Sequence, residues 1–165
     1  MAHSALAGHK FKKDLVSRMK KGNIDPNGKP DFSAEGVVRM NAGVEGLQED
    51  YIAAGSPKVS FDATGTKHDG YTDPGHVHLN KTTIKNNYRY ASALFHEYRH
   101  AWQWIYKWNN WVTNHGVSTA WDLMERDAYG YTIQIGLYDP YNISDSIIKE
   151  NFDYYMGITK HIKHF

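Results

Sequence analysis

Apolar spacing and helix end signals predict five helices. Apolar side chains recur every three or four positions, as on one face of a helix, over residues 4–21, 33–54, 88–108 and 144–162. A helix over 119–137 is predicted because Ser118 or Thr119 can cap it, Asp122 lies in its first turn and Pro140 lies beyond its end. The stripe in 33–54 is the most regular, although Gly43 and Gly46 lie within it and each costs about 1 kcal/mol relative to alanine. The segment 88–108 contains neither glycine nor proline and has a broad apolar face.

Two short stretches alternate between apolar and polar residues, which is the pattern of a strand. They are residues 58–61 and 76–80, and in the second stretch Val77 and Leu79 share one face. The residues between them, 62–75, are predicted as a long polar loop because they contain several glycines and an Asp-Pro-Gly turn. We therefore predict an α+β fold that is mostly helical, with about five helices and a small sheet of two to four strands.

Length and composition narrow the classes of protein. A chain of 165 residues is enough for one domain with its own core, which we expect to span residues 1–165 and to be a monomer. The 19 basic and 18 acidic side chains leave a net charge of +1, so charge gives no reason to expect a nucleic-acid partner. The chain has no cysteine, which excludes disulfides and thiolate metal ligands.

The apolar segments also bear on location. No stretch is long and apolar enough to predict a membrane span. Residues 1–8 lack a basic start followed by a long apolar run, so we recognise no signal peptide. The residues therefore leave the compartment open: we expect a domain that is either secreted or delivered as part of a larger protein, with the cytoplasm as the alternative.

The candidate chemistry lies in the helix predicted over 88–108, which contains a His-Glu-x-x-His sequence. Residues four apart lie on one face of a helix, so His96 and His100 can reach the same metal ion. Two imidazoles suit Zn²⁺, and a catalytic zinc site leaves one position for water. Glu97 is displaced around the helix from the two histidines, which places its carboxylate to accept a proton from such a water. Two buried histidines without a metal are the alternative.

A third ligand is sought in the helix predicted over 119–137. Glu125 follows His100 by 25 residues, which is enough for a turn and an antiparallel return, and it would complete a His₂Glu zinc site. Asp122 and Asp127 are rivals for this position. Asp122 lies one turn from Glu125, whereas Asp127 faces about 200° away from it on an ideal helix.

These motifs resemble those of a known family. The His-Glu-x-x-His sequence at 96–100, followed by Glu125-x-x-Ala128, is similar to the zincin metallopeptidases whose third ligand is a glutamate. It resembles in particular the compact bacterial zincin domains that form C-terminal toxin modules of Rhs-type and other polymorphic toxins. The resemblance covers about residues 77–131, and it implies a zincin-like fold, bound zinc and cleavage of peptide bonds.

The resemblance also implies how a substrate binds. In zincins the strand before the metal helix is the edge of the sheet and pairs with an extended substrate, and residues 77–80 hold that position here. His76 and His78 would then line the cleft. The side chains that we consider as donors to the substrate carbonyl are His115, Tyr129 and Tyr131.

One position departs from the family pattern. In the thermolysin branch of the zincins an aspartate four residues after the glutamate ligand supports a histidine, and this chain has Tyr129 there. Metal-bound histidines need such a partner. Either the support comes from elsewhere, with Asp122 and Asp127 as candidates, or Glu125 is not the ligand.

We therefore expect a zinc metalloendopeptidase in which Glu97 is the general base, acting on a protein target as a bacterial toxin or effector. Its other partner would be an immunity protein. Two alternatives remain open: an intracellular regulatory peptidase that cleaves a repressor, and a non-catalytic binding domain stabilised by zinc.

Overall fold

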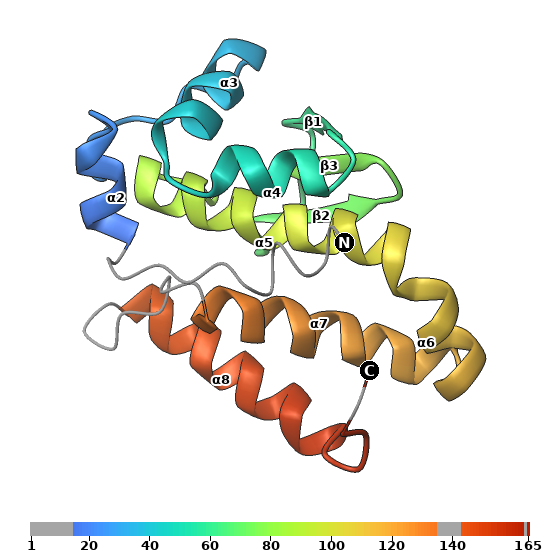
Figure 1. The fold of residues 1–165 in the computed structure, drawn as a ribbon. Helices are drawn as coiled ribbons and strands as arrows, with labels where there is room; N and C mark the ends of the chain where they lie inside the picture. Colours follow the sequence, from blue (N-terminus) through green and yellow to red (C-terminus); the bar gives the residue numbers. More distant parts are fainter. Residues whose placement is uncertain (1–14, 135–142, 164) are drawn as a thin grey trace.

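The computed structural model describes residues 15–134, 143–163 and 165, with the side chains of 143–148 excepted. Figure 1 shows the arrangement. The helices are α2 (Leu15–Lys21), α3 (Ala34–Gly43), α4 (Leu47–Ala53), α5 (Asn87–Tyr106), α6 (Trp108–His115), α7 (Val117–Gln134) and α8 (Ile143–Ile158), and the strands are β1 (Lys58–Ser60), β2 (Gly70–Asp73) and β3 (His76–Leu79). The predicted α+β class with a helical majority and a small sheet is confirmed. Residues 4–14 and 135–137 of the predicted helices lie outside the described residues.

The helix predicted over 33–54 is two helices. Ser33 caps α3 by accepting a hydrogen bond from the Gly36 N–H, as an N-cap serine does. The chain leaves the helical conformation at Val44, and Gly46 has a φ of 91°, which favours glycine. The apolar stripe continues across this break because both helices bury it, so periodicity alone did not reveal the turn.

The sequence pattern predicts no helix between 88–108 and 119–137, yet this segment is mostly helical. The backbone at Lys107 departs from helical geometry between α5 and α6, and Gly116, with a φ of 85°, separates α6 from α7. Trp111 is buried in α6 and belongs to a second apolar cluster with Leu123 and Met124 of α7. Burial of this tryptophan accounts for helical structure in a segment that looks polar.

The sheet has the order β1-β3-β2, with β1 parallel and β2 antiparallel to β3. The prediction that the strand before the metal helix is an edge strand is therefore wrong. The segment 62–75 contains β2, which pairs with β3 through the Pro74-Gly75 turn and takes the edge position. Because β2 has the polar sequence Gly-Tyr-Thr-Asp, it lacks the alternation that marks a half-buried strand.

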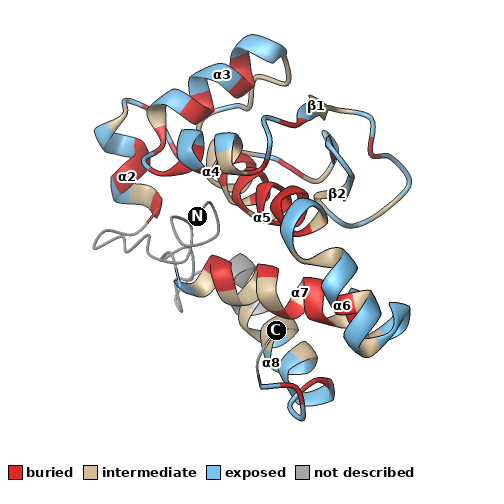
Figure 2. Cartoon of the chain, turned by 45° about the vertical axis from the view of Figure 1, so that its right-hand side comes forward, coloured by how far each residue is buried: buried red, intermediate tan, exposed pale blue. Residues whose placement is uncertain are grey.

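Helix α5 is the centre of the fold. It packs against α4 on one side and α7 on another, and it also contacts β2 and β3. In Figure 2 most of the visible part of α5 is coloured as buried. The main core combines α5 side chains such as Leu94, Phe95 and Trp102 with Val77 and Leu79 of β3. Within the described residues, none of the helices has the length and apolar character needed to cross a bilayer.

Candidate metal centre

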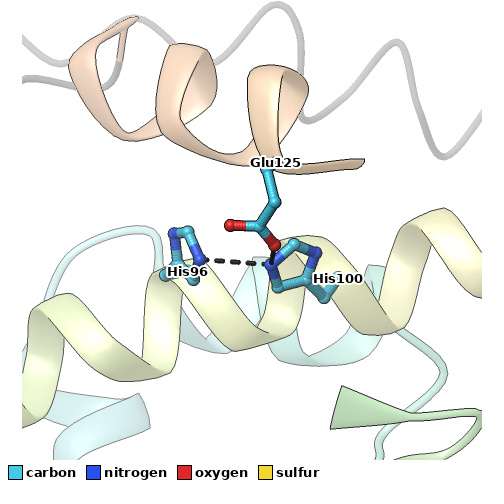
Figure 3. Close-up of side chains that lie close together, drawn as sticks. All are labelled: His96, His100 and Glu125. Carbon is cyan, nitrogen blue, oxygen red and sulfur yellow. Dashed lines mark hydrogen bonds and ion pairs between the residues drawn. The ribbon is translucent and has the colours of Figure 1, made fainter. Parts of the chain in front are cut away.

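Three side chains from two helices converge at one point, as Figure 3 shows. His96 and His100 rise from α5, and the carboxylate of Glu125 points toward them from α7. Nε2 of His100 lies 3.1 Å from Nε2 of His96 and 2.9 Å from Oε1 of Glu125. One ligand atom from each residue lies within 4.8 Å of the others. Among the described residues this is the one such group found.

The convergence follows from the packing of α5 and α7. Three of the contacts between the helices show their relative direction: His96 with Tyr129, His100 with Glu125, and Trp104 with Trp121. Residues ascend by four along α5 while their partners descend by four along α7. The two helices are therefore antiparallel, and the spacing that aligns the histidines also aligns the carboxylate with them.

The charges of the three groups are strongly coupled. Burial alone would raise the pKa of Glu125, but the two histidines outweigh it and lower that pKa to about 2. Burial opposes a charge on His100, yet the neighbouring Glu125 raises the pKa of His100 to about 9. Burial and the proximity of His100 lower the pKa of His96 to about 4. These shifts show that the Glu125 carboxylate favours a positive charge beside it, which is where a metal ion would be held.

The donor set fits zinc. Two imidazole nitrogens and one carboxylate oxygen form a known catalytic zinc set. Ligand atoms at ordinary zinc distances are separated by roughly 3.3 Å in a tetrahedral site. Two of the observed separations, 3.1 and 2.9 Å, are slightly shorter than this, and all three ligand atoms lie within 4.8 Å of one another, so small side-chain movements would bring them to zinc distances.

The second nitrogen of His100 is held by Gln103. Nδ1 of His100 lies 2.8 Å from Oε1 of Gln103, and the fully buried amide donates from Nε2 to Asp127 at 2.7 Å and to the Met124 carbonyl at 2.9 Å. Because Nδ1 is the donor to the amide oxygen, Nε2 is left to bind a metal. The Gln103 amide thus supports a histidine, as the aspartate of the resembled pattern does at the position where this chain has Tyr129.

Asp127 is thus part of the support and not a ligand. Its carboxylate also accepts two hydrogen bonds from Arg99, at 2.8 and 3.0 Å. Asp122 does not belong to the converging group or to the described residues that line the adjoining cavity. Gln103 was missed by sequence reasoning, although its position three residues after His100 puts it within reach on the same helix.

Glu97 is buried beside the two histidines, with 4% of its surface exposed. Its Oε1 accepts a hydrogen bond from the Thr72 hydroxyl at 2.8 Å. Burial raises the pKa of Glu97 to about 7. Thr72 lies in β2, so it escaped the sequence analysis together with that strand. The Glu97 carboxylate is thus held through one oxygen by Thr72, and its raised pKa favours uptake of a proton.

A cavity of about 720 Å³ adjoins the three converging side chains. Its walls are the segment 67–73, which includes β2, together with α5, α7 and α8. Glu97 lines it, as do Tyr129 and Tyr155. The Tyr129 ring lies 4.7 Å from the His96 ring and is parallel to the Tyr155 ring at 6.2 Å. Burial raises the pKa of Tyr129, so its phenol keeps its proton at neutral pH.

Several predicted site residues are not brought to this cavity. His115 ends α6 and is not among the described residues that line it. The hydroxyl of Tyr131 is buried against Asp50. His76 contacts Ser60 of β1 instead, and His78 contacts Asp62, two residues beyond the end of that strand. Of the three predicted carbonyl donors, only Tyr129 lines the cavity.

Comparison with known proteins adds no relative. No family model matches the chain, and neither the curated proteins nor the solved structures include a significant match. The function of the chain must therefore be inferred from its motif and from the geometry of this site.

Proposed function

We propose that the protein is a zinc-dependent hydrolase of peptide bonds. One observation carries the proposal: the ligand atoms of His96, His100 and Glu125 converge beside a buried carboxylate, that of Glu97, at the wall of a large cavity. A structural zinc site is closed by protein ligands on all sides. Here three protein ligands border an open cavity, which favours catalysis over the alternative of a zinc-stabilised binding domain.

We assign the following roles to the residues of the site. His96, His100 and Glu125 would hold the metal, which when bound polarises the substrate carbonyl and acidifies a water molecule. Glu97 accepts the proton of the attacking water and delivers it to the leaving amine nitrogen. Thr72 keeps the Glu97 carboxylate in place through one oxygen and leaves the other oxygen for the proton.

The hydroxyl of Tyr129 is our candidate for the donor to the carbonyl oxygen as charge develops on it. The ring lies against His96, and the cavity that it lines would hold the substrate. Tyr155 lines the same cavity and is its rival. We give His115 no part in the reaction because it does not line the cavity.

An extended peptide would pair with β2. This strand is the edge of the sheet on the side of the cavity, and an unpaired edge is a template for another strand. The strand that sequence reasoning assigned to this role, β3, pairs on both sides. We thus place the substrate on the neighbouring strand.

The biological setting that we propose is a toxin or effector domain, delivered as part of a larger protein and neutralised by an immunity protein. The resemblance of its motifs to those of zincin toxin modules supports this setting. Cleavage of one repressor by an intracellular enzyme is the alternative. Toxicity on expression, relieved by a neighbouring gene, would distinguish the two settings.

The test of the activity compares the zinc-loaded protein with its zinc-loaded Glu97→Gln variant on a library of proteome-derived peptides. We expect new amino termini with the parent protein and none with the variant. A chelator should abolish cleavage by the parent and added zinc should restore it. Cleavage by Glu97→Gln at the parental rate would refute the role of Glu97, and no cleavage by the zinc-loaded parent would refute the activity.

A further inference from the structure

The two ends of the cavity differ. Past the metal ligands, in the direction of the carboxyl end of α5, stand three tryptophans: Trp104, Trp108 and Trp121. Their ring centroids lie 4.7, 5.6 and 4.7 Å apart in pairs, so the cluster is closely packed. Trp121 lines the cavity on the α7 side. Trp104 of α5 and Trp121 of α7 contact each other one turn beyond His100, and Trp108 of α6 packs against both.

The same cluster limits pairing along β2. The indole N–H of Trp104 donates to the Thr72 carbonyl at 2.9 Å. Asp69 accepts from the Asn80 N–H, so residues 69 and 71 face β3 and residues 70 and 72 face outward, as antiparallel pairing alternates. Trp104 therefore occupies an outward carbonyl of the edge. A bound peptide that pairs with β2 can continue only in the other direction, toward Gly70 and Asp69.

That direction leads to two cations. Arg89, in the first turn of α5, and Lys67, two residues before Asp69, both line the cavity. The walls between them and the metal ligands include the small side chains Ser92 and Ala93, which leave room for a peptide. The cavity thus has one ring of the tryptophan cluster, Trp121, at one end and basic groups at the other.

Arg89 is oriented but only partly neutralised. Its Nε donates to Asp69 Oδ2 at 2.6 Å, and 38% of its side chain is exposed. This bond holds the guanidinium by one edge and directs its terminal nitrogens elsewhere. Lys67 is exposed and adds a second positive charge, so Lys67, Arg89 and Asp69 together carry a net charge of +1.

From these observations, and on the basis of the proposed peptidase activity, we propose that Arg89 and Lys67 form a subsite for an acidic side chain of the substrate. Arg89 precedes His96 by seven residues, which is roughly 10 Å along a helix. An extended peptide rises about 3.3 Å per residue. The acidic side chain therefore lies roughly three residues from the bond that is cut.

The test uses pairs of fluorescein-labelled peptides that differ only by Glu or Gln at positions two to four on either side of a central bond. Binding is measured by anisotropy to the zinc-loaded Glu97→Gln protein, so that it does not depend on hydrolysis. We expect the glutamate peptide of one pair to bind roughly twofold to fivefold more tightly, as for a part-exposed ion pair. Equal affinities in all pairs, or no binding of any peptide, would overturn the proposal.

Variants in the same background identify the residues. Lys67→Gln should reduce the preference for glutamate, and the double change Lys67→Gln with Arg89→Gln should abolish it. Lys85→Gln, an exposed lysine that does not line the cavity, is the matched control and should keep it. Because Arg89 also holds Asp69, circular dichroism and zinc content check the fold, and Lys67→Gln tests the subsite without breaking that ion pair. An unchanged preference in the folded double variant would refute the assignment.

The same peptides offered to the parent protein separate the two proposals. Glutamate-dependent binding without any cleavage would leave the subsite standing and refute the peptidase. Cleavage at equal rates in each pair, with equal binding, would support the peptidase and refute the subsite.

Discussion

His100 and Gln103 form a hydrogen bond of 2.8 Å that joins the candidate metal centre to the ion pair of Asp127 and Arg99. The amide oxygen accepts a hydrogen bond from Nδ1–H of His100, and the amide nitrogen in turn donates to the Asp127 carboxylate. The ring of His100 therefore has one orientation and one tautomer available for binding a metal through Nε2.

Replacing Gln103 with leucine should weaken zinc binding. Loss of such a supporting hydrogen bond typically costs roughly tenfold to a hundredfold in metal affinity. Isothermal titration of the metal-free protein with zinc measures the change. Gln48→Leu, at an exposed position of α4, is the control and should bind zinc as the parent does. Equal affinities for the two variants would show that the amide does not support the ligand.

The identity of the third ligand is tested by two matched amide variants. Glu125→Gln should lower zinc affinity by more than the roughly tenfold to hundredfold expected for a lost supporting bond. Asp122→Asn, one turn away on α7, should leave the affinity close to that of the parent. Competition with a zinc indicator measures both. The reverse order of effects would assign the ligand to Asp122.

The two helices that carry this site could be predicted from sequence, α5 from its broad apolar face and α7 from its capping residues and the proline beyond its end. His96 and His100 are four residues apart, and Glu125 follows at a separation that allows an antiparallel return. These spacings predicted one shared site, and the ligand atoms of the three residues do lie close together. Gln103 could not be singled out, since a buried amide has no signature until its partners on α7 are known.

The strand β2 escaped prediction for a different reason. Its residues Gly70 to Asp73 are polar, and they are ordered by pairing with β3 and by contacts with α5, both of which are tertiary. Gly70 fits there because a Cβ atom would lie 2.5 Å from the His78 carbonyl oxygen. Because β2 was not predicted, the edge position was assigned to β3, and the contact between Thr72 and Glu97 was not foreseen.

Thr72→Val should lower the rate of hydrolysis while zinc remains bound. Valine keeps the shape of threonine but removes the hydroxyl that holds Glu97 Oε1. Since positioned acid–base catalysis contributes roughly a hundredfold or more, a misplaced carboxylate should cost about tenfold in kcat. Thr72→Ser keeps the hydroxyl and should retain most of the activity. Equal losses in both variants would mean that packing, and not the hydrogen bond, accounts for the effect.

Asp50 should make the stability of the protein depend on pH. The side chain is 1% exposed, and burial raises its pKa from 3.8 to about 7. Glu49 raises that pKa further, whereas the hydrogen bond from Tyr131 and the charges of Arg99 and Arg18 oppose the rise. Between these two pKa values the folded protein binds a proton that the unfolded chain has lost.

The free energy of unfolding should therefore fall as pH rises from about 4 to above 7, by up to about 1.4 kcal/mol per pH unit from this group. Asp50→Asn, which cannot ionise, should flatten the decline, and urea denaturation of metal-free protein at a series of pH values measures it. Glu150→Gln on the exposed side of α8 serves as the control. A decline of the same slope in Asp50→Asn would show that another group is responsible.

A crystal structure of the zinc-soaked protein, with diffraction data collected on both sides of the zinc absorption edge, tests the central claim most directly. We predict one anomalous peak at about 2.0–2.2 Å from His96 Nε2, His100 Nε2 and a Glu125 oxygen, with a solvent ligand on the side of Glu97. A zinc ion bound elsewhere, or one whose fourth ligand is a protein side chain, would contradict the account.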